Sequence, residues 1–564
     1  MSGLNTSTKT VFSSGSARLD GVMIGEAWNT ATLLYSLPRS NAEYGFGYGA
    51  NEDDGHFGPA SQLESVTTAI LDKTNGNSAD DGFAVEGFTD QNIVKTLAGN
   101  AAVRVNQTAS DPYFYGTAWG YYPGFEDTSG DVWLSSVIYD YGSPTIGQYD
   151  HYVVMHEIGH ALGLKHGHEA DGFGTLPRQF DAMEFSVMTY RSYINSGVSE
   201  STNDTNGYAQ SWMMSDIAAL QHMYGADFTT NSGDTVYSWT PGSGDTRVDG
   251  GVGIDPLTNT IFATIWDGGG RDTYDLSQYT TNLMLDLAPG GHSMFSSAQL
   301  AGLGDGQVPQ GNIYNALLYQ SDLRSLIENA KGGSGNDLIS GNEADNRLTG
   351  NAGNDRMNGL AGDDTLLGQS GADVLNGNAG DDTLDGGAGR DVLRGGGQND
   401  TLIAGGDFDR LFGAAGNDKL VAGTGNDVLF GGAGQDKLNG QAGNDTMNGG
   451  AGNDLLIGGA GRDIMTGGAG RDTFQFLAAS DSPIGAQNDI ITDFTSGQDR
   501  IDLRAFDLDV LAFSGGFSQT TATVVVRTLN DEVRIFADTD ANGQADMRIT
   551  LDGTDSITRG DFLL

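Results

Sequence analysis

Apolar residues recur at one fixed place of a nine-residue pattern that fills residues 331–476. In sixteen consecutive nonads the eighth position is always apolar, from Ile339 to Phe474. Small and polar residues fill most of the first six positions, so each nonad predicts one short strand with a single core-facing side chain. Two nonads on opposite sides make one coil of a parallel β-roll. The regularity disfavours the alternative interpretation, a disordered Gly/Asp-rich linker.

The pattern differs on both sides of the repeats. Residues 19–230 have ordinary globular composition with helical and strand-like stretches, and residues 231–330 are rich in strands separated by Gly/Asp turns. Residues 477–564 alternate apolar and polar positions, as antiparallel strands do. We therefore expect a multidomain chain: an α+β domain, a β-rich bridging segment, an all-β parallel roll and a C-terminal β-sandwich. Residues 1–18 are expected to form a flexible tail or a short propeptide.

The sixth position of fifteen nonads is aspartate, and glycines precede it. Glycine permits the positive-φ turn that aims carbonyls inward. Aspartate adds an anionic oxygen, and oxygen-only sites suit Ca²⁺. The repeat resembles the GGxGxDxUx calcium repeat of RTX proteins. The residues expected to bind calcium in the roll are Gly333, Gly335, Asp337, Gly350, Ala352, Asp355, Asp364, Asp373, Asp382, Asp391, Asp418, Asp427, Asp436, Asp445, Asp454, Asp463 and Asp472.

Three nonads depart from the repeat. Those whose sixth residues are Asn346, Asp400 and Asp409 lack glycine at the fourth position. Because glycine supplies the left-handed turn, we expect weak or missing calcium sites in these three nonads.

The composition excludes several classes of protein. The chain holds 28 Lys and Arg against 74 Asp and Glu, a net charge of −46. No basic surface remains to bind a nucleic acid, and the self-repulsion calls for bound cations. The absence of cysteine excludes disulfides, thiolate zinc fingers and cysteine nucleophiles. No apolar run reaches the ~18 residues of a membrane span, and no N-terminal secretion signal is readable, so we expect no membrane insertion.

Five of the eight histidines lie within residues 151–168, around the sequence HEIGHALGLKH. His156 and His160 are four positions apart, so a helix projects both from one face and lets them share a metal. Glu157 lies between them, where it can act as general base on a water molecule at that metal. Two imidazoles and a neighbouring carboxylate therefore predict a catalytic metal site.

Gly163 can end this helix with a left-handed turn and return His166 as a third ligand. Three neutral imidazoles with one open position describe a catalytic zinc site. The full HExxHxxGxxH motif resembles the metzincin signature, which also requires a downstream Met-turn. Residues 186–190 supply one with the sequence SVMTY. The resemblance implies Met188 as an apolar floor beneath the metal, and Tyr190 as a fifth zinc ligand that stabilises the oxyanion.

Most of the chain resembles the serralysin-type secreted metalloproteases. The segments that carry the resemblance include LDGVMIGEAWNTATLLYSLP, SDIAALQHMYGAD, WDGGGRDTYDLS and ITDFTSGQDRIDL. It implies a metzincin catalytic domain over 19–230, an RTX roll over 331–476 and a β-sandwich over 477–564. The implied activity is zinc-dependent hydrolysis of peptide bonds in extracellular proteins, with one Zn²⁺ and several Ca²⁺. A further calcium site is implied at Asn231, Gly233, Thr235, Asp267, Gly269 and Asp272.

Some residues around the motif differ from the family's sequence pattern or lie outside it. His166 is followed by Gly167 and His168, where a proline is expected in the relatives, so substrate preference stays open. Three histidines already satisfy zinc, so His168 is expected to be a neighbour, and His151 has no assigned role. The resemblance places an edge strand at 116–121, able to pair with an extended substrate. The alternative is that the aromatic residues there belong to the core.

The roll is expected to be a folding switch. At the low calcium inside a cell its aspartates repel one another, whereas millimolar calcium outside converts binding free energy into folding free energy. The last four residues, 561–564, resemble the ending of proteins exported by bacterial type I systems, with an ordinary last strand as the alternative. A further candidate calcium loop runs from Asp538 to Gly543 with Asp546, where a polar hairpin explains the residues equally well.

The expected partners are polypeptide substrates, a protein inhibitor of the protease and the type I secretion machinery, for an extracellular monomer. The main alternative function is an RTX adhesin or structural calcium-binding protein with a vestigial protease domain. The complete set of three histidines with Glu157 and Tyr190 argues against decay. A second alternative, an RTX lipase, lacks support because the chain contains no GxSxG motif.

Overall fold

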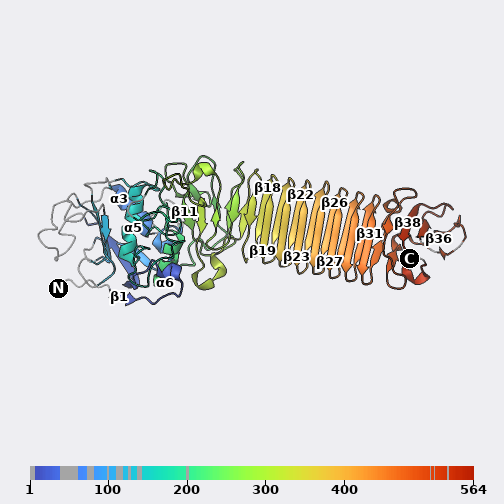
Figure 1. The fold of residues 1–564 in the computed structure, drawn as a ribbon, viewed down its shortest axis with the longest axis horizontal. Helices are drawn as coiled ribbons and strands as arrows, with labels where there is room; N and C mark the ends of the chain where they lie inside the picture. Colours follow the sequence, from blue (N-terminus) through green and yellow to red (C-terminus); the bar gives the residue numbers. More distant parts are fainter. Residues whose placement is uncertain are drawn as a thin grey trace. The chain divides into compact units, whose positions relative to one another are not determined.

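The computed structural model describes residues 7–38, 61–72, 82–97, 101–108, 118–124, 129–135, 141, 143–198, 202–508, 510–513, 515–529, 532–554 and 556–564. The chain divides into two compact units (Figure 1). The first contains residues 1–279 and 283–329, and the second contains 280–282 and 330–564. Among the described residues, no helix has the length and apolar character needed to cross a membrane.

The first unit contains a five-stranded sheet next to the helices that carry the histidines. Its order is β4 (Asn92–Lys95), β3 (Thr32–Ser36), β5 (Val103–Thr108), β7 (Asp131–Ser135) and β6 (Ala118–Gly120). Strands β4, β3, β5 and β7 are parallel, and β6 pairs antiparallel with β7 at the edge. The helices are α3 (Ser61–Leu71), α4 (Val85–Phe88), α5 (Tyr149–Leu162) and α6 (Met214–Tyr224). Strand β7 and most of α5 are buried, which places α5 in the core of this unit.

The N-terminal segment differs from the expected flexible tail. Strand β1 (Ser7–Thr10) pairs antiparallel with β2 (Glu26–Asn29), and α1 covers Ala17–Asp20. The carboxylate of Asp20 accepts hydrogen bonds from the hydroxyls of Ser13 and Ser14. These bonds were not predicted, because serine-rich segments of this kind usually remain loose. Residues 1–6 lie outside the described residues.

Short strands complete the first unit. One group joins β10 (Gly251–Ile254), β9 (Thr246–Val248), β8 (Val236–Ser238) and β12 (Thr273–Asp275). A second group joins β11 (Ala263–Ile265), β15 (Ile313–Asn315) and β14 (His292–Ser293). The unit also holds β13 (Met284–Asp286), and β16 covers Asn329–Lys331. These strands agree with the strand-rich pattern expected between residues 231 and 330.

The second unit is a parallel β-roll, as the nonads predict, and its successive strands stack in Figure 1. Alternate nonads form two sheets, and each strand pairs in parallel with the strand 18 residues later, as Leu348 pairs with Leu366. Every apolar eighth position is at most 1% exposed. The strands are β17 (Leu338–Ser340), β18 (Arg347–Ala352), β19 (Arg356–Ala361), β20 (Thr365–Ser370), β21 (Val374–Ala379), β22 (Thr383–Ala388), β23 (Val392–Gly397), β24 (Thr401–Gly406), β25 (Arg410–Ala415), β26 (Lys419–Thr424), β27 (Val428–Ala433), β28 (Lys437–Ala442), β29 (Thr446–Ala451), β30 (Leu455–Ala460), β31 (Ile464–Ala469) and β32 (Thr473–Gln475).

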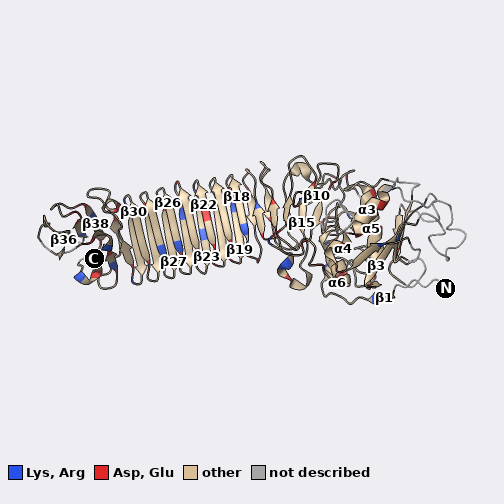
Figure 2. Cartoon of the chain, turned by 180° about the vertical axis from the view of Figure 1, so that it is seen from behind, with Lys and Arg blue, Asp and Glu red and all other residues tan. Residues whose placement is uncertain are grey.

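Charge is segregated within the roll. Lysine and arginine occupy several strands, whereas Asp385 in β22 is the single acidic residue of β17–β32 (Figure 2). The repeat aspartates precede the strands, in the turns. The negative charge of the roll is therefore concentrated in the turns, where the repeat predicts calcium.

The residues after the roll extend its two sheets. Strands β36 (Thr523–Leu529), β37 (Glu532–Asp538) and β38 (Met547–Asp552) form the expected antiparallel meander, with β35 (Val510–Ala512) beside β36. β38 continues one sheet through β33 (Ile490–Ile491). β34 (Arg500–Asp502) and β39 (Phe562–Leu563) continue the other. The chain therefore ends in two β-layers, and residues 562–563 form a strand.

Candidate metal centre and calcium sites

Helix α5 presents His156 and His160 one turn apart and ends as the sequence predicts. Gly163 caps it in the left-handed conformation with φ 106°. A Cβ at Gly163 would lie 2.5 Å from the carbonyl oxygen of Glu26, so both the backbone angle and the space require glycine. The turn brings His166 back to the two helical histidines.

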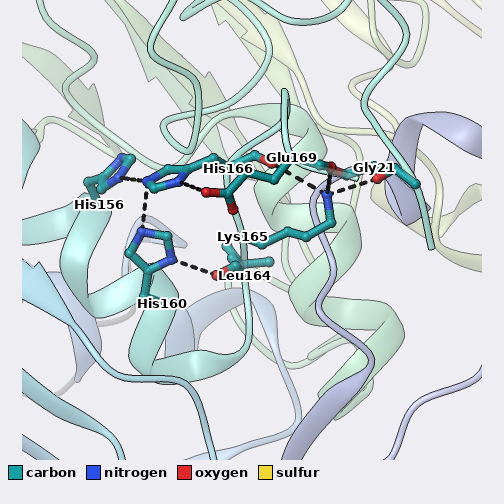
Figure 3. A network of polar contacts seen from close by, with 8 residues as sticks. Gly21, His156, His160, Leu164, Lys165, His166 and Glu169 are labelled. Atoms are coloured by element: carbon teal, nitrogen blue, oxygen red, sulfur yellow. Dashed lines mark hydrogen bonds and ion pairs between the residues drawn. The ribbon is translucent and has the colours of Figure 1, made fainter. Parts of the chain in front are cut away.

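The three imidazoles face one another through their Nε2 atoms (Figure 3). The Nε2 of His166 lies 3.0 Å from that of His160 and 3.1 Å from that of His156. Zinc with Zn–N distances of about 2.0–2.1 Å in tetrahedral geometry separates its nitrogens by about 3.3–3.4 Å. The spacing of the three nitrogens therefore fits one zinc ion after a small adjustment.

The opposite ring nitrogens fix the tautomers. His156 Nδ1 lies 2.7 Å from the Val187 carbonyl oxygen, and His160 Nδ1 lies 2.9 Å from that of Leu164. Both acceptors require Nδ1 to carry the proton, which leaves the Nε2 lone pairs directed at one another. Converging lone pairs repel unless a cation lies between them, so the donor set fits a metal.

The third histidine has a carboxylate behind it, because His166 Nδ1 lies 2.8 Å from Glu169 Oε1. A carboxylate behind a ligating imidazole orients the ring and raises its basicity. Burial lowers the pKa of His156 to about 4, and burial with the neighbouring His156 lowers that of His166 to about 2. The imidazoles are therefore neutral near pH 7, the form that binds metal. The position of Glu169 behind His166 is not apparent from the sequence motif.

Glu157 is buried beside the histidines. Burial raises the pKa of its carboxyl to about 8, opposed by a hydrogen bond from the backbone N–H of Gly120 in β6. A cation at the three imidazoles would favour the ionised form. A carboxylate whose pKa lies this close to neutrality is suited to accept and return a proton.

Tyr190 and His168 both lie against His166. The Tyr190 ring centroid is 4.3 Å from that of His166, and the His168 ring stacks on His166 at 5.5 Å. Burial and the nearby Glu157 raise the pKa of Tyr190 to about 12, so its hydroxyl remains a hydrogen-bond donor. The structure thus places Tyr190 beside the three histidines. His168 stacks on His166 but does not belong to the group of His156, His160 and His166.

The Met-turn lies beneath helix α5. A Cβ at Gly159 would lie 2.5 Å from the Met188 sulfur, so a glycine between the two helical histidines makes room for this methionine. The buried carboxylate of Asp216 accepts hydrogen bonds from Ser186 Oγ at 2.6 Å and from the Val187 N–H at 2.7 Å. Asp216 therefore holds the segment whose carbonyl supports His156, a role that the sequence analysis did not assign.

Part of the edge strand expected at residues 116–121 to pair with a substrate is present. Residues 118–120 form β6, the edge strand next to β7, and residues 116–117 lie outside the described residues. Gly120 packs against the main chain of Glu157, where a Cβ would collide with the helix. The edge of the sheet therefore lies directly beside the general-base candidate.

The residues of the expected calcium site before the roll come together. Thr235 Oγ1 donates to the carbonyls of Asn231 and Gly233, and Asp272 Oδ1 accepts from the Thr235 N–H. The N–H of Gly269 donates to Asp267 Oδ1. Burial and the adjacent Asp272 raise the pKa of Asp267 well above its ordinary value. Asp272 Oδ2 is buried without a hydrogen-bond partner, so this oxygen-rich group fits a bound cation.

The repeat aspartates share one geometry in the roll. From Asp355 to Asp472, each Oδ1 accepts the N–H of the repeat residue 18 positions earlier, as Asp436 N donates to Asp454 Oδ1 at 2.9 Å, whereas Asp337 accepts the Gly333 N–H at its Oδ2. A Cβ at Gly449 would lie 2.5 Å from Asp454 Oδ2 and 2.7 Å from the Gly467 carbonyl oxygen. The buried Oδ2 has no partner in Asp355, Asp364, Asp373, Asp382, Asp391, Asp400, Asp409, Asp418, Asp427, Asp436, Asp445, Asp454, Asp463 and Asp472. Unpaired carboxylate oxygens beside carbonyls fit Ca²⁺.

In two of the three nonads without glycine at the fourth position, the aspartate has the same hydrogen bond and the same unpaired oxygen as in the other nonads. Asp400 and Asp409 accept the same backbone hydrogen bonds at 2.9 and 2.8 Å. Gln398 and Asp407, at the fourth positions, also take a positive φ, 76° and 75°, whereas the glycines at this position from Gly353 to Gly470 have φ between 106° and 158°. The structure therefore gives no sign of weak or missing calcium sites at Asp400 and Asp409, and their calcium binding stays a prediction. Asn346 does differ, because its amide donates to Asn342 Oδ1.

The calcium-free roll is expected to be more stable in mild acid. Burial raises the pKa of Asp445 to about 7 and that of Asp454 to about 6, against 3.8 ordinarily. The folded chain therefore binds these protons more tightly than the unfolded chain. The resulting stability is complete below about pH 4 and is lost as the pH rises through about 6 to 7.

The β-structure that the roll retains in a calcium-selective chelator, followed by circular dichroism at different pH values, measures this dependence. This β-structure is expected to be greater near pH 5 than near pH 8, roughly on either side of these pKa values. The calcium midpoint is expected to rise as the pH falls, because calcium has to displace the protons. A calcium-free β-structure that increased from acid to alkaline pH would contradict the assigned shifts.

Comparisons with known proteins identify the family of the chain. The roll with aspartate-lined turns and the three-histidine centre together define the RTX metalloprotease class. The sequence profile described as "Peptidase M10 serralysin C terminal" matches residues 226–564, more than half of the chain, so the chain belongs to the serralysin family. The profile begins after the three histidines.

Individual relatives match over shorter stretches. Serralysin from Proteus mirabilis is 32% identical over 256 residues, 44% of this chain and 45% of the relative. Serralysin A from Dickeya chrysanthemi is 37% identical over 228 residues, 40% and 43% respectively. The chain thus spans less than half the length of the curated relatives it matches. The AlgE6R3 subunit of the Azotobacter vinelandii mannuronan C5-epimerase is 30% identical, with a TM-score of 0.21, over 28% of this chain and 81% of its own.

Proposed function

We propose that the protein is a secreted zinc endopeptidase that cleaves extracellular proteins and is stabilised by calcium in its roll. The observation that carries the proposal is the set of three imidazoles whose Nε2 lone pairs converge while their Nδ1 atoms are hydrogen-bonded. Glu157 and Tyr190 lie beside this set, which supports hydrolysis over a structural metal. Zinc would supply Lewis acidity toward water and toward the scissile carbonyl.

The residues around the zinc ligands supply the other steps of the mechanism. Glu157 takes the proton of the attacking water and passes it to the leaving amine. Burial raises the pKa of its carboxyl to about 8, close to neutral pH, which suits both transfers. The Tyr190 hydroxyl donates a hydrogen bond to the oxyanion as the tetrahedral intermediate forms. The edge strand β6 pairs with an extended substrate and sets its direction past Glu157.

The Tyr190→Phe variant is expected to lower kcat by about 10²–10³ with a small change in KM, because the lost hydroxyl acts mainly on the transition state. Steady-state kinetics on a fluorogenic peptide measure both constants. Phenylalanine preserves the ring that packs against His166. A KM increase equal to the loss in kcat/KM would assign Tyr190 to ground-state binding instead.

Endopeptidase activity has a direct test. Casein incubated with the purified chain in millimolar calcium is expected to yield internal cleavages, identified by mass spectrometry of the new N-termini. A protein that retained zinc but left casein intact would support the adhesin with a vestigial domain.

Export and partners complete the proposal. We propose an extracellular monomer, exported by bacterial type I machinery, that encounters polypeptide substrates and a protein inhibitor. The calcium-dependent roll supports this route, because its unneutralised aspartates keep the chain expanded until it meets millimolar calcium.

A further inference from the structure

Lys165 lies between the second and third histidines along the chain, and its side chain is completely buried. A buried ammonium needs hydrogen-bond acceptors or counter-charges to offset the loss of water. Its Nζ donates to main-chain carbonyls, at 2.8 Å to Gly21, Glu169 and Gly174 and at 3.3 Å to His166 (Figure 3). Among the residues that the structure describes, no carboxylate forms an ion pair with it.

We infer that Lys165 is a positioning residue for the zinc site, because its ammonium ties the loop carrying His166 and Glu169 to the N-terminal segment at Gly21. The inference rests on the proposed zinc function. It assigns Lys165 no contact with substrate or with the reacting atoms.

The connection from the ammonium to the third ligand is short. Lys165 Nζ holds the main-chain carbonyl of Glu169, whose carboxylate accepts from His166 Nδ1 at 2.8 Å. It also holds the carbonyl of His166 itself. The Glu169 side chain is 34% exposed, so packing alone does not fix it. Removing the ammonium takes this donor from the carbonyls of Gly21, Glu169 and Gly174, so the loop loses its tie to the N-terminal segment.

The backbone of the N-terminal segment, at residues 22–24, also pairs with residues 163–165. The Lys165 N–H donates to the Val22 carbonyl at 2.9 Å, and the Ile24 N–H donates to the Gly163 carbonyl at 3.1 Å. Between these bonds, Met23 and Leu164 form an antiparallel bridge. The carbonyl of Leu164 is the acceptor for His160 Nδ1, so the docked segment supports two of the three ligands.

Zinc affinity tests the inference without any measurement of catalysis. Lys165→Met keeps most of the side-chain volume and removes the charge. Competition with a chromophoric chelator in millimolar calcium is expected to give a zinc Kd about 10–100-fold higher than that of the parent chain. Lys437→Met, which changes an exposed lysine of β28, is the matched control and is expected to leave the Kd unchanged.

The two proposals fail in different ways. A parent chain that binds no zinc would contradict the proposed function. A Lys165→Met variant that binds zinc within twofold of a zinc-binding parent would overturn the positioning role, even if its melting temperature fell.

Two further variants keep the test decisive. Glu169→Ala removes the carboxylate behind His166 and leaves the Lys165 acceptors in place, since those are main-chain atoms. It is expected to weaken zinc binding about tenfold. The double variant Lys165→Met/Glu169→Ala is expected to lose less zinc-binding free energy than the two single variants together, because both changes act through His166. If Lys165→Met fails to fold, an unchanged zinc Kd in Glu169→Ala overturns the inference.

The absence of cysteine allows a chemical rescue. A Lys165→Cys chain has a single thiol, which 2-bromoethylamine converts in denaturant into a close analogue of lysine. After refolding with calcium, the alkylated chain is expected to recover the zinc affinity of a parent chain taken through the same steps. Equal affinity with and without the added amine would overturn the role of the ammonium.

Discussion

The Glu157→Gln variant is expected to keep its zinc and to lose about 10²–10⁴ of kcat/KM, the usual contribution of a general base. The three Nε2 atoms face one another without help from Glu157, so the metal ligands remain in place. Glutamine retains an oxygen that can accept the hydrogen bond from the Gly120 N–H. It cannot take a proton from water, so the loss falls on the chemical step.

Metal analysis and peptide hydrolysis of the same sample measure both parts of this expectation. Glu26→Gln changes an exposed side chain of β2 and is the control for the loss of one carboxylate. Activity of Glu157→Gln within tenfold of the parent would assign the base to another group. Loss of zinc together with activity would show that Glu157 supports the metal site.

The second large effect is expected from calcium, which should fold the roll. Fourteen repeat aspartates have a buried oxygen without a hydrogen-bond partner. Without calcium their charges repel, so an expanded chain with little β-structure from the roll is expected. Millimolar calcium is expected to produce a cooperative gain of β-structure and a smaller hydrodynamic radius, because each ion joins loops of successive coils.

Circular dichroism and light scattering during a calcium titration measure this transition, with Glu157→Gln as the parent to prevent self-cleavage. Magnesium is expected to have no such effect, since it prefers a tighter octahedron and keeps its waters. Asp409→Asn is expected to raise the calcium midpoint as much as Asp418→Asn, because both side chains have the same contacts. Asp385→Asn, which removes a charge from strand β22, is the control. A roll already compact in chelator would contradict the switch.

The features predicted from the sequence are those that short-range rules determine. The repeat places one apolar residue in every nonad, and burial of residues such as Leu366 leads directly to two parallel sheets. The four-residue spacing of His156 and His160 determines their common helix face, and Gly163 determines the turn that follows. Each of these conclusions needs only the local chain and its periodicity.

The features that the sequence did not predict depend on contacts between distant segments. Lys165 and Gly21 are 144 positions apart, and a lysine in a sequence gives no sign that it will be buried. Asp216 supports Ser186 from 30 positions away. At Asp409 the pattern called for glycine at position four, whereas the structure holds Asp407 there with a positive φ of 75°. Packing with the neighbouring coils stabilises that backbone conformation, and the isolated nonad does not reveal it.

Casein hydrolysis by the purified chain, measured before and after selective removal of its zinc, tests whether the protein is a zinc endopeptidase. In millimolar calcium, we expect one zinc per chain. We also expect activity to be lost with 1,10-phenanthroline and restored by one equivalent of zinc after the chelator is removed. Undiminished hydrolysis by a chain shown to contain no zinc would contradict the proposed function.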